Sequence, residues 1–185
     1  MNLDVLKKWI TRWEGVRYVA YDDGTGKPIT AETLLKGKPH IGVGFNLSAG
    51  GAEAIVEGIG LDYQAVCKGE VKITPEQVDQ LLDATIAVAT KEAKKLFPAL
   101  DTYPEDQQLI VADLVFNMGE GALATRFPKT VLAIKAQDWP AASAALKDSH
   151  WFTQVGAKPT QRGGEDVAIL GGTVTVASVL APKKS

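Results

Sequence analysis

One long amphipathic segment constrains the fold of this 185-residue chain more than any other feature. Its start has Thr74 as N-cap, Pro75 at the first helical position and Gln77 closing a capping box. Apolar residues then recur at helical spacing, at Val78, Leu81, Leu82, Ile86, Ala89, Ala93 and Leu96. A helix over 74–97 is more than about 30 Å long at roughly 1.5 Å per residue. In so small a chain, such a helix predicts two lobes that it joins.

The segments on either side of this helix differ in pattern, which predicts a lobe 1–73 and a lobe 98–185 around the connection at 74–97. The second lobe has helical patterns, and its run Leu109–Phe116 is apolar nearly all round, as expected of a buried central helix. Asp113 is the only charge in that run, and we expect it to hydrogen-bond a neighbouring helix end. Further helices are predicted around Val131 and from Trp139 to Leu146. The tail after Gly172 is expected to be a short strand or irregular.

The first lobe begins with an amphipathic helix that Asn2 can cap and Gly15 can end. Glu14 is therefore its last residue, where the helix macrodipole disfavours a carboxylate. Flanking apolar side chains act in the same direction, and a carboxyl that keeps its proton suits a general acid. The alternative is an ordinary solvent-facing glutamate at a frayed helix end.

A strand, a turn, a loop and a second strand follow this helix. Tyr18 to Tyr21 is predicted as a strand, and Asp22 to Gly26 as a turn. Residues 27–39 are predicted as a polar inserted loop, residues 40–45 as a second strand, and residues 48–72 as one or two short helices. The two adjacent aspartates lack the alternating oxygen ligands of a calcium loop, so a cation site is disfavoured.

Three polar side chains can converge in this arrangement. Glu14 ends a helix, Asp23 lies in the turn and His40 opens the second strand. Two carboxyl groups and a neighbouring polar group suit general acid–base chemistry on a neutral, poorly reactive bond such as a glycoside. Gly42 and Gly44 allow close backbone approach, but the rest of a nucleotide-binding loop is missing.

Composition excludes several other classes. A net charge of −2 gives no basic surface for nucleic acid, and Cys67, as the one cysteine, cannot form an internal disulfide. Charges interrupt the N-terminal residues 2–12, which disfavours a signal peptide. No stretch approaches the roughly 20 apolar residues of a membrane span. We therefore expect a soluble protein made in the cytoplasm.

At these residues the chain resembles the phage lysozymes, or endolysins, of glycoside hydrolase family 24, over roughly residues 5–172. The resemblance is carried by short motifs in both lobes: Glu14-Gly15-x-Arg17, Ala20-Tyr21-x-Asp23, Ile41-Gly42-x-Gly44, Phe116-Asn117-Met118-Gly119, Phe127, Trp139, Trp151, Gln154 and Arg162. It implies a mostly helical, bilobed α+β fold, with a small sheet lobe joined by the long helix to a helical lobe. The whole forms one lysozyme domain.

The resemblance also implies roles for particular residues. Glu14 matches the general acid, and Asp23 matches the carboxylate that stabilises the oxocarbenium-like transition state or guides water. Arg162 matches an arginine that reaches across the cleft and orients the catalytic glutamate. Asn117 and Trp151 match cleft-wall positions, and Gly44 is grouped with them as a substrate-binding position. No metal and no cofactor are implied, and we expect a monomer.

His40 departs from the family pattern, which has a threonine immediately before Ile-Gly-x-Gly. An insertion precedes the histidine here, and three interpretations remain open. The imidazole holds or deprotonates the attacking water, or it replaces the water and attacks the sugar, giving retention or glycosyl transfer. In the third interpretation His40 is passive and Asp23 suffices.

The expected function is therefore that of a muramidase, which cleaves the β-1,4 bond between N-acetylmuramic acid and N-acetylglucosamine in bacterial peptidoglycan. The alternatives are a lytic transglycosylase, which needs one glutamate and no water-guiding carboxylate, and a non-catalytic wall-binding module. Without an export segment, the protein is expected in the host cytoplasm. A holin or similar permeabilising partner would then give it access to the periplasm and the wall.

Overall fold

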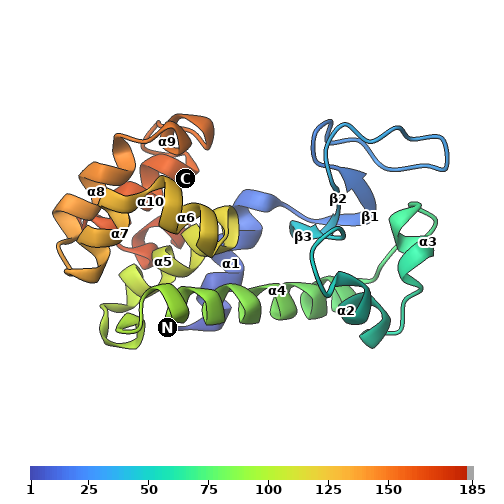
Figure 1. Ribbon diagram of the computed structural model, residues 1–185, viewed down its shortest axis with the longest axis horizontal. Helices are drawn as coiled ribbons and strands as arrows, with labels where there is room; N and C mark the ends of the chain where they lie inside the picture. The colour runs from blue at the N-terminus through green and yellow to red at the C-terminus, as the bar shows by residue number, and fades with distance from the viewer. Residues whose placement is uncertain (183–185) are drawn as a thin grey trace. The chain divides into compact units, whose positions relative to one another are not determined.

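The computed structural model describes residues 1–182, which form two compact units. Ile10–Ala87 is one unit, and Met1–Trp9 together with the described residues from Val88 onward is the other. Helix α1 (Leu3–Glu14) and helix α4 (Pro75–Leu96) each contribute residues to both units (Figure 1). The predicted α+β class, mostly helical with a small N-terminal sheet, is confirmed.

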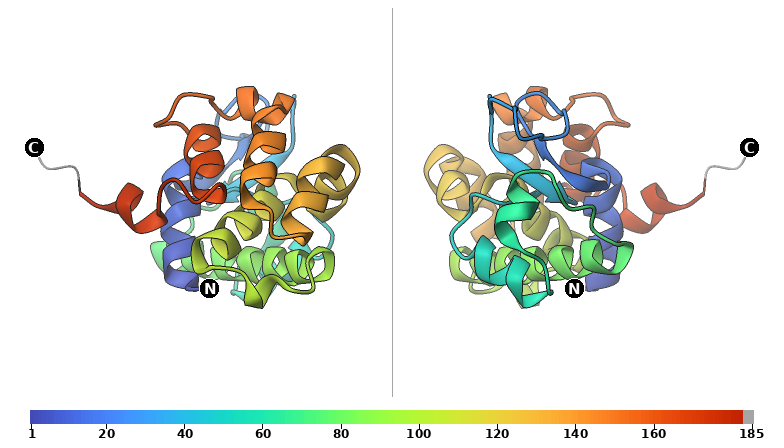
Figure 2. Two further views of the ribbon diagram at one scale, coloured as in Figure 1. Left: turned by 90° about the vertical axis from the view of Figure 1, so that its left-hand side faces the viewer. Right: turned by 90° about the vertical axis from the view of Figure 1, so that its right-hand side faces the viewer.

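The N-terminal unit is built on a three-stranded antiparallel sheet in the order β1-β2-β3. Its strands are β1 (Arg17–Asp22), β2 (Pro39–Gly42) and β3 (Phe45–Asn46), and short helices α2 (Ala52–Gly58) and α3 (Tyr63–Cys67) follow. The right-hand view of Figure 2 shows α2 and α3 beside the sheet. Tyr21 pairs with His40, so the register sets these two side by side. The unit's core is fully buried at Ile10, Ala20, Ile41, Leu47, Val56 and Leu81.

The prediction of one strand over residues 40–45 is wrong. Gly42 and Gly44 have φ angles of +65° and +70°, a conformation that glycine adopts without steric cost. The chain therefore reverses at these residues into a hairpin, in which Ile41 pairs with Phe45 and His40 with Asn46. The alternating glycines indicated this turn, because positive φ interrupts a strand.

The C-terminal unit is helical. After the short 3-10 helix η1 (Leu100–Thr102) come α5 (Glu105–Met118), α6 (Glu120–Arg126), α7 (Pro128–Lys135), α8 (Trp139–Lys147), α9 (His150–Gln154), α10 (Arg162–Leu170) and α11 (Val176–Leu180). The run 109–115 of α5 is buried throughout, as predicted for the central helix. In the left-hand view of Figure 2 the helices of this unit face the viewer, with α11 at its edge.

Three short helices of this unit were not predicted. Gly119 ends α5 as expected, but the chain resumes as α6 one residue later. Ser149 caps α9, because its side chain accepts a hydrogen bond from the backbone N–H of Phe152. Thr175 caps α11 in the same way, by accepting a hydrogen bond from the backbone N–H of Ser178. The expectation of a strand or irregular chain after Gly172 is therefore wrong for residues 176–180. The tail lysines, Lys183 and Lys184, lie outside the described residues.

The long helix matches its prediction. The N–H of Gln77 donates to Thr74 Oγ1 at 3.3 Å, and the N–H of Thr74 donates to Gln77 Oε1 at 2.9 Å, which completes the capping box. All seven residues of the predicted apolar stripe are buried. None of the described helices is both long and apolar enough to span a bilayer.

Candidate active site

Glu14 closes α1, and Gly15, with φ +69°, turns the chain into β1. The Glu14 carboxyl lies against the β2–β3 turn: a Cβ added to Gly44 would be 3.5 Å from Glu14 Oε2 and 3.6 Å from Glu14 Cγ. Gly44 thus gives the carboxyl room at the sheet, and its φ of +70° also favours glycine. Glu14 and Gly44, which were both predicted as site residues, therefore lie together inside the N-terminal unit.

Asp22 organises the turn that follows β1. Its carboxylate accepts hydrogen bonds from the backbone N–H groups of Gly24 (3.0 Å), Lys36 (2.9 Å) and Gly37 (2.8 Å), and from the Thr25 hydroxyl (3.2 Å). These donors, the N–H of Lys36 foremost, lower the pKa of Asp22. The carboxylate therefore fastens the inserted loop to the turn, and its oxygens serve the protein's own donors rather than a cation.

Asp23 is held by the same loop. Its N–H donates to the carbonyl of Lys38 at 3.0 Å, and the N–H of Lys38 donates in return to Asp23 Oδ1 at 2.5 Å. Gly37 passes so close that an added Cβ would overlap Asp23 Oδ1. The Asp23 side chain remains 43% exposed. The loop thus fixes one oxygen of this carboxylate and leaves the group open to solvent.

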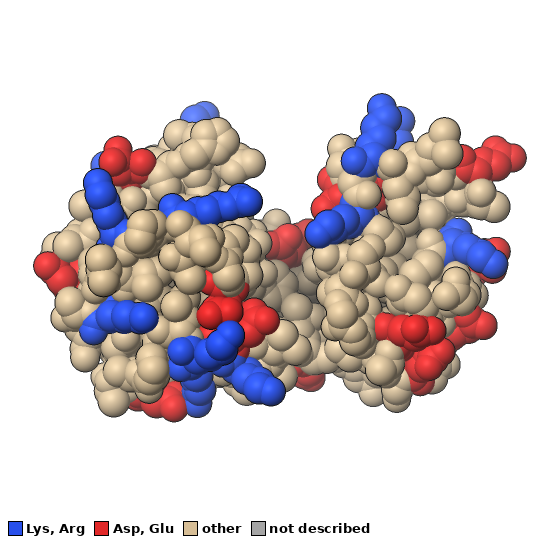
Figure 3. All heavy atoms as spheres, viewed as in Figure 1, with Lys and Arg blue, Asp and Glu red and all other residues tan. Residues whose placement is uncertain are grey.

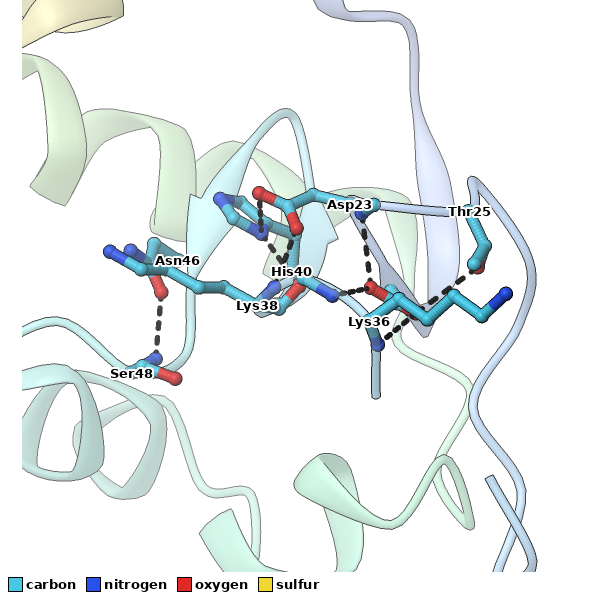
Figure 4. Close-up of polar contacts among 10 residues, drawn as sticks. Asp23, Thr25, Lys36, Lys38, His40, Asn46 and Ser48 are labelled. Atoms are coloured by element: carbon cyan, nitrogen blue, oxygen red, sulfur yellow. Dashed lines mark hydrogen bonds and ion pairs between the residues drawn. The ribbon is translucent and has the colours of Figure 1, made fainter. Parts of the chain in front are cut away.

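His40 lies beside Asp23, as Figure 4 shows. Its Nδ1 is 3.1 Å from the carbonyl oxygen of Lys38 and 3.7 Å from Asp23 Oδ2. Both neighbours are acceptors, so in the neutral ring they favour the proton on Nδ1 and leave the lone pair on Nε2. The ring therefore has an oriented basic nitrogen that does not face Asp23.

Tyr21 connects these groups, although it is not among the predicted site residues. Its ring centroid is 5.9 Å from that of His40, and the guanidinium carbon of Arg17 is 5.8 Å from its ring. Burial raises the pKa of Tyr21, the charge of Glu14 raises it further, Arg17 opposes the rise and Asp23 adds to it. Both carboxyl groups therefore act on one phenol. The sequence signal for Tyr21 was its position two residues before Asp23, because side chains two residues apart on a strand point to the same face.

The C-terminal unit brings together two other predicted residues. Trp151 Nε1 donates to Asn117 Oδ1 at 2.7 Å, from α9 to the end of α5. Because an indole nitrogen only donates, this bond fixes the amide and turns its NH2 group the other way. Both residues line a pocket of about 550 Å³, together with Met118, Ala122, Arg126, Phe127, Ser149, His150, Gln154 and Val155. Trp151 is 6% exposed, so it serves as a buried wall of this pocket.

Arg162, the first residue of α10, is 5% exposed and is held inside the C-terminal unit. Its Nη2 donates to Asp113 Oδ1 at 2.7 Å and its Nε donates to Asp113 Oδ2 at 3.3 Å. The expected bond from Asp113 to a neighbouring helix end is thus an ion pair with the first residue of α10. A second buried acid, Asp166, was missed because nothing in its local pattern separates it from an exposed helical aspartate.

Charged side chains are also distributed over the surface of both units. On the face drawn in Figure 3, basic and acidic side chains are interspersed over each unit. Among residues 1–182, no three His, Cys, Asp or Glu side chains cluster in a way that could hold a metal ion. In the N-terminal unit a carboxyl, an exposed carboxylate and an oriented imidazole share one region, which can donate a proton and activate water.

Comparison with known protein families yields one match. A family model described as phage lysozyme matches residues 11–163, a range that contains all seven predicted site residues. This range is narrower than the resemblance seen in the sequence, since it leaves out most of α1 and most of α10. No curated protein matches the chain.

Proposed function

The chain belongs to the phage lysozyme family, which makes it a lysozyme-type peptidoglycan hydrolase, and on this premise we propose that it is a muramidase. It cleaves the β-1,4 bond between N-acetylmuramic acid and N-acetylglucosamine, as the enzymes of glycoside hydrolase family 24 do. The observation that carries the proposal is the shared location of Glu14, Asp23 and His40 around Tyr21. Two carboxyl groups in distinct surroundings are what glycoside hydrolysis requires.

Each residue takes one role in this proposal. Glu14, beside Gly44, donates a proton to the glycosidic oxygen as the bond breaks. Asp23 is partly exposed, and its carboxylate stabilises the positive charge that develops on the sugar. Asn117 and Trp151 bind substrate along the pocket of the C-terminal unit, and a substrate-binding role of Arg162 stays a prediction.

His40 acts on the water. With Nδ1 between the Lys38 carbonyl and Asp23, the neutral ring presents the lone pair of Nε2 as a base. Nε2 accepts a proton from water as the water attacks the far face of the sugar, which gives inversion. A direct attack of Nε2 on the sugar would instead give retention or glycosyl transfer.

Lysis of chloroform-treated Gram-negative cells, followed by turbidity, tests the proposal. Glu14→Gln should lower the rate by about 10²–10⁴-fold, the usual contribution of a general acid, without loss of thermal stability. Glu57→Gln, an exposed change in the same unit, is the control and should be without effect. Unchanged lysis by Glu14→Gln would refute the assignment of the proton donor.

Products separate hydrolysis from transglycosylation. Asp23→Asn should also lose activity, and the wild type should release reducing muramic acid ends. Full activity of Asp23→Asn together with anhydro-muramic products would identify a lytic transglycosylase instead. If the wild type, with Glu14 and Asp23 both intact, releases no product, the chain would be a non-catalytic wall-binding module.

NMR of the anomeric products from peptidoglycan fragments tests His40. We expect inversion in the wild type and a slower but still inverting His40→Thr enzyme. Initial retention in the wild type that becomes inversion in His40→Thr would establish nucleophilic attack by His40. Equal rates and equal stereochemistry would show that the histidine is passive.

Access to the wall is a further part of the proposal. An enzyme made in the host cytoplasm acts in the periplasm only after the membrane is permeabilised, as a holin would do. Co-expression with a holin should cause lysis, whereas expression alone should not. Lysis on expression alone would count against this route.

A further inference from the structure

A row of three side chains crosses the open face of the sheet in the N-terminal unit. Tyr21 of β1 pairs with His40 of β2, and His40 pairs with Asn46 of β3. Residues that pair directly in an antiparallel sheet carry their side chains on the same face. In the next pair, Ile41 and Phe45 are 0% and 5% exposed, so the opposite face is the buried one. The three paired residues are partly exposed and therefore lie side by side on the open face.

The side-chain amide of Asn46 is held in one orientation. Its Oδ1 accepts a hydrogen bond from the backbone N–H of Ser48 at 2.8 Å, as Figure 4 shows. Because a backbone N–H only donates, this bond identifies the oxygen of the amide and directs the NH2 group away from Ser48. Among residues 1–182, this NH2 group donates to no protein acceptor. The sheet thus presents a fixed donor on its open face.

A fixed group that only donates selects a partner that accepts. A sugar hydroxyl can turn to donate or to accept, whereas a carbonyl oxygen only accepts. In the glycan of peptidoglycan, each N-acetylated sugar carries such an oxygen in its acetamido group. The NH2 group of Asn46 therefore complements an acetamido carbonyl better than it complements a hydroxyl.

Asn46 lies next to the groups assigned to catalysis. Its partner across the strands, His40, has Nδ1 at 3.7 Å from Asp23 Oδ2. Two residues before it, Gly44 lies against the Glu14 carboxyl. All of these residues belong to the N-terminal unit. Because directly paired residues have Cβ atoms only about 4.5–5.5 Å apart, a sugar that reaches His40 also reaches Asn46.

We infer that Asn46 is a specificity-determining residue, whose side-chain amide donates a hydrogen bond to the acetamido carbonyl of the amino sugar beside His40. The inference rests on the proposed function, because it names the sugars that the same site accepts. An amino sugar without its acetyl group carries an ammonium group, which only donates and offers no acceptor to Asn46. The site should therefore discriminate between N-acetylated and N-deacetylated glycan strands.

Asn46→Asp reverses the polarity of this group. A carboxylate can still accept the hydrogen bond from Ser48, but it presents an acceptor where the amide presented donors. With soluble N-acetylated glycan fragments, KM should rise by about tenfold and kcat should change by less than about threefold, because the contact is made in the bound substrate and in the transition state alike. With the same fragments after chemical N-deacetylation, KM should not rise. The preference in kcat/KM for the acetylated substrate should therefore fall by about tenfold or more.

Two further variants separate the hydrogen bond from charge and folding. Gln64→Glu makes the same change of amide to carboxylate at an exposed position of α3 in the same unit, and it should keep the wild-type preference. Asn46→Ala removes the donor without adding charge, and it should lower the preference by about threefold to tenfold. An equal fall in Gln64→Glu would show long-range attraction of the cationic substrate and would refute a hydrogen bond from Asn46.

Binding can be followed without turnover by NMR of the nitrogen-15-labelled side-chain amide of Asn46 in the full chain. We expect the β-1,4 trimer of N-acetylglucosamine to shift this resonance. The β-1,4 trimer of glucosamine should leave it unchanged. Equal shifts with both trimers would count against recognition of the acetyl group.

The outcomes for the inference and for the proposed function are distinct. A wild-type preference in both Asn46 variants would overturn the inference, and so would an equal loss of activity toward both substrates, which indicates a structural role. If the acetylated trimer alone shifts Asn46 but the wild type lyses no cells, the proposed function fails and the acetamido contact stands. If the wild type lyses cells but neither the preference nor the resonance responds, the inference fails and the proposed function stands.

Discussion

Two aspartates, one in each unit, are equally hidden from solvent, but folding shifts their pKa values in opposite directions. Asp22 in the N-terminal unit is 1% exposed, and Asp166 in the C-terminal unit is 0% exposed. Three backbone N–H groups and a hydroxyl surround Asp22 and lower its pKa, whereas Asp166 faces another acid and its pKa is raised. Burial alone therefore does not decide whether an acid is charged, because the number of donors around it does.

The largest expected effect comes from removing a buried cation of the C-terminal unit. Arg162→Met should lower the free energy of unfolding by about 3–5 kcal/mol at neutral pH, because it removes the guanidinium that binds the buried Asp113 and lies beside the buried Asp166. The loss should shrink at acidic pH, where both acids are protonated. Chemical denaturation at two pH values measures it, with the exposed Lys147→Met as control, expected within about 0.5 kcal/mol of the wild type. An equal loss at both pH values would show packing, and not charge, to be the cause.

A smaller effect is expected from the loop that fixes the N-terminal acids. Gly37→Ala should destabilise the protein by about 1–3 kcal/mol, since its Cβ would overlap Asp23 Oδ1. Lytic activity should fall as well, because Asp23 must move. Gly50→Ala, whose Cβ would meet no atom within 4 Å, is the matched control. Full activity of Gly37→Ala would mean that the position of Asp23 is not critical.

The pocket of the C-terminal unit offers a milder test of what one hydrogen bond contributes. Trp151→Phe removes the donor to Asn117 and keeps most of the ring, so a loss of about 1 kcal/mol is expected in denaturation. Trp139→Phe, whose ring packs edge-on against Tyr103, is the comparison. A larger loss for Trp139→Phe would show that ring size matters more than the bond.

The smallest effects are opposite pH slopes of stability. A lowered pKa means that the contribution of Asp22 is present above its unfolded pKa, 3.8, and is lost as the pH falls through its lower native pKa. The contribution of Asp166 is lost in the other direction, as the pH rises. The loss of melting temperature as the pH falls should therefore become smaller in Asp22→Asn, and the loss as the pH rises above 3.8 should become smaller in Asp166→Asn. Slopes of the same sign in the two variants would contradict the comparison.

The sequence predicted the elements whose determinants are local. The capping box at Thr74 and the apolar stripe as far as Leu96 specify α4, and the apolar run 109–115 specifies α5. The carboxyl at the helix end, the acidic turn and His40 lie in the same unit and are linked through Tyr21, because they follow one another along a short segment. Their catalytic roles remain proposals.

Other features depend on contacts between distant parts of the chain. Lys36 and Gly37 bind a carboxylate fourteen and fifteen residues earlier, and Asp113 meets Arg162 across forty-nine residues, so no local pattern reveals either contact. The hairpin at Gly42 and Gly44 required φ values that the sequence allowed but did not impose. The sequence by itself determined the helices and the candidate acids. Only the tertiary structure decided in which direction the pKa values of Asp22 and Asp166 shift, because these shifts depend on the donors and charges that folding gathers around each group.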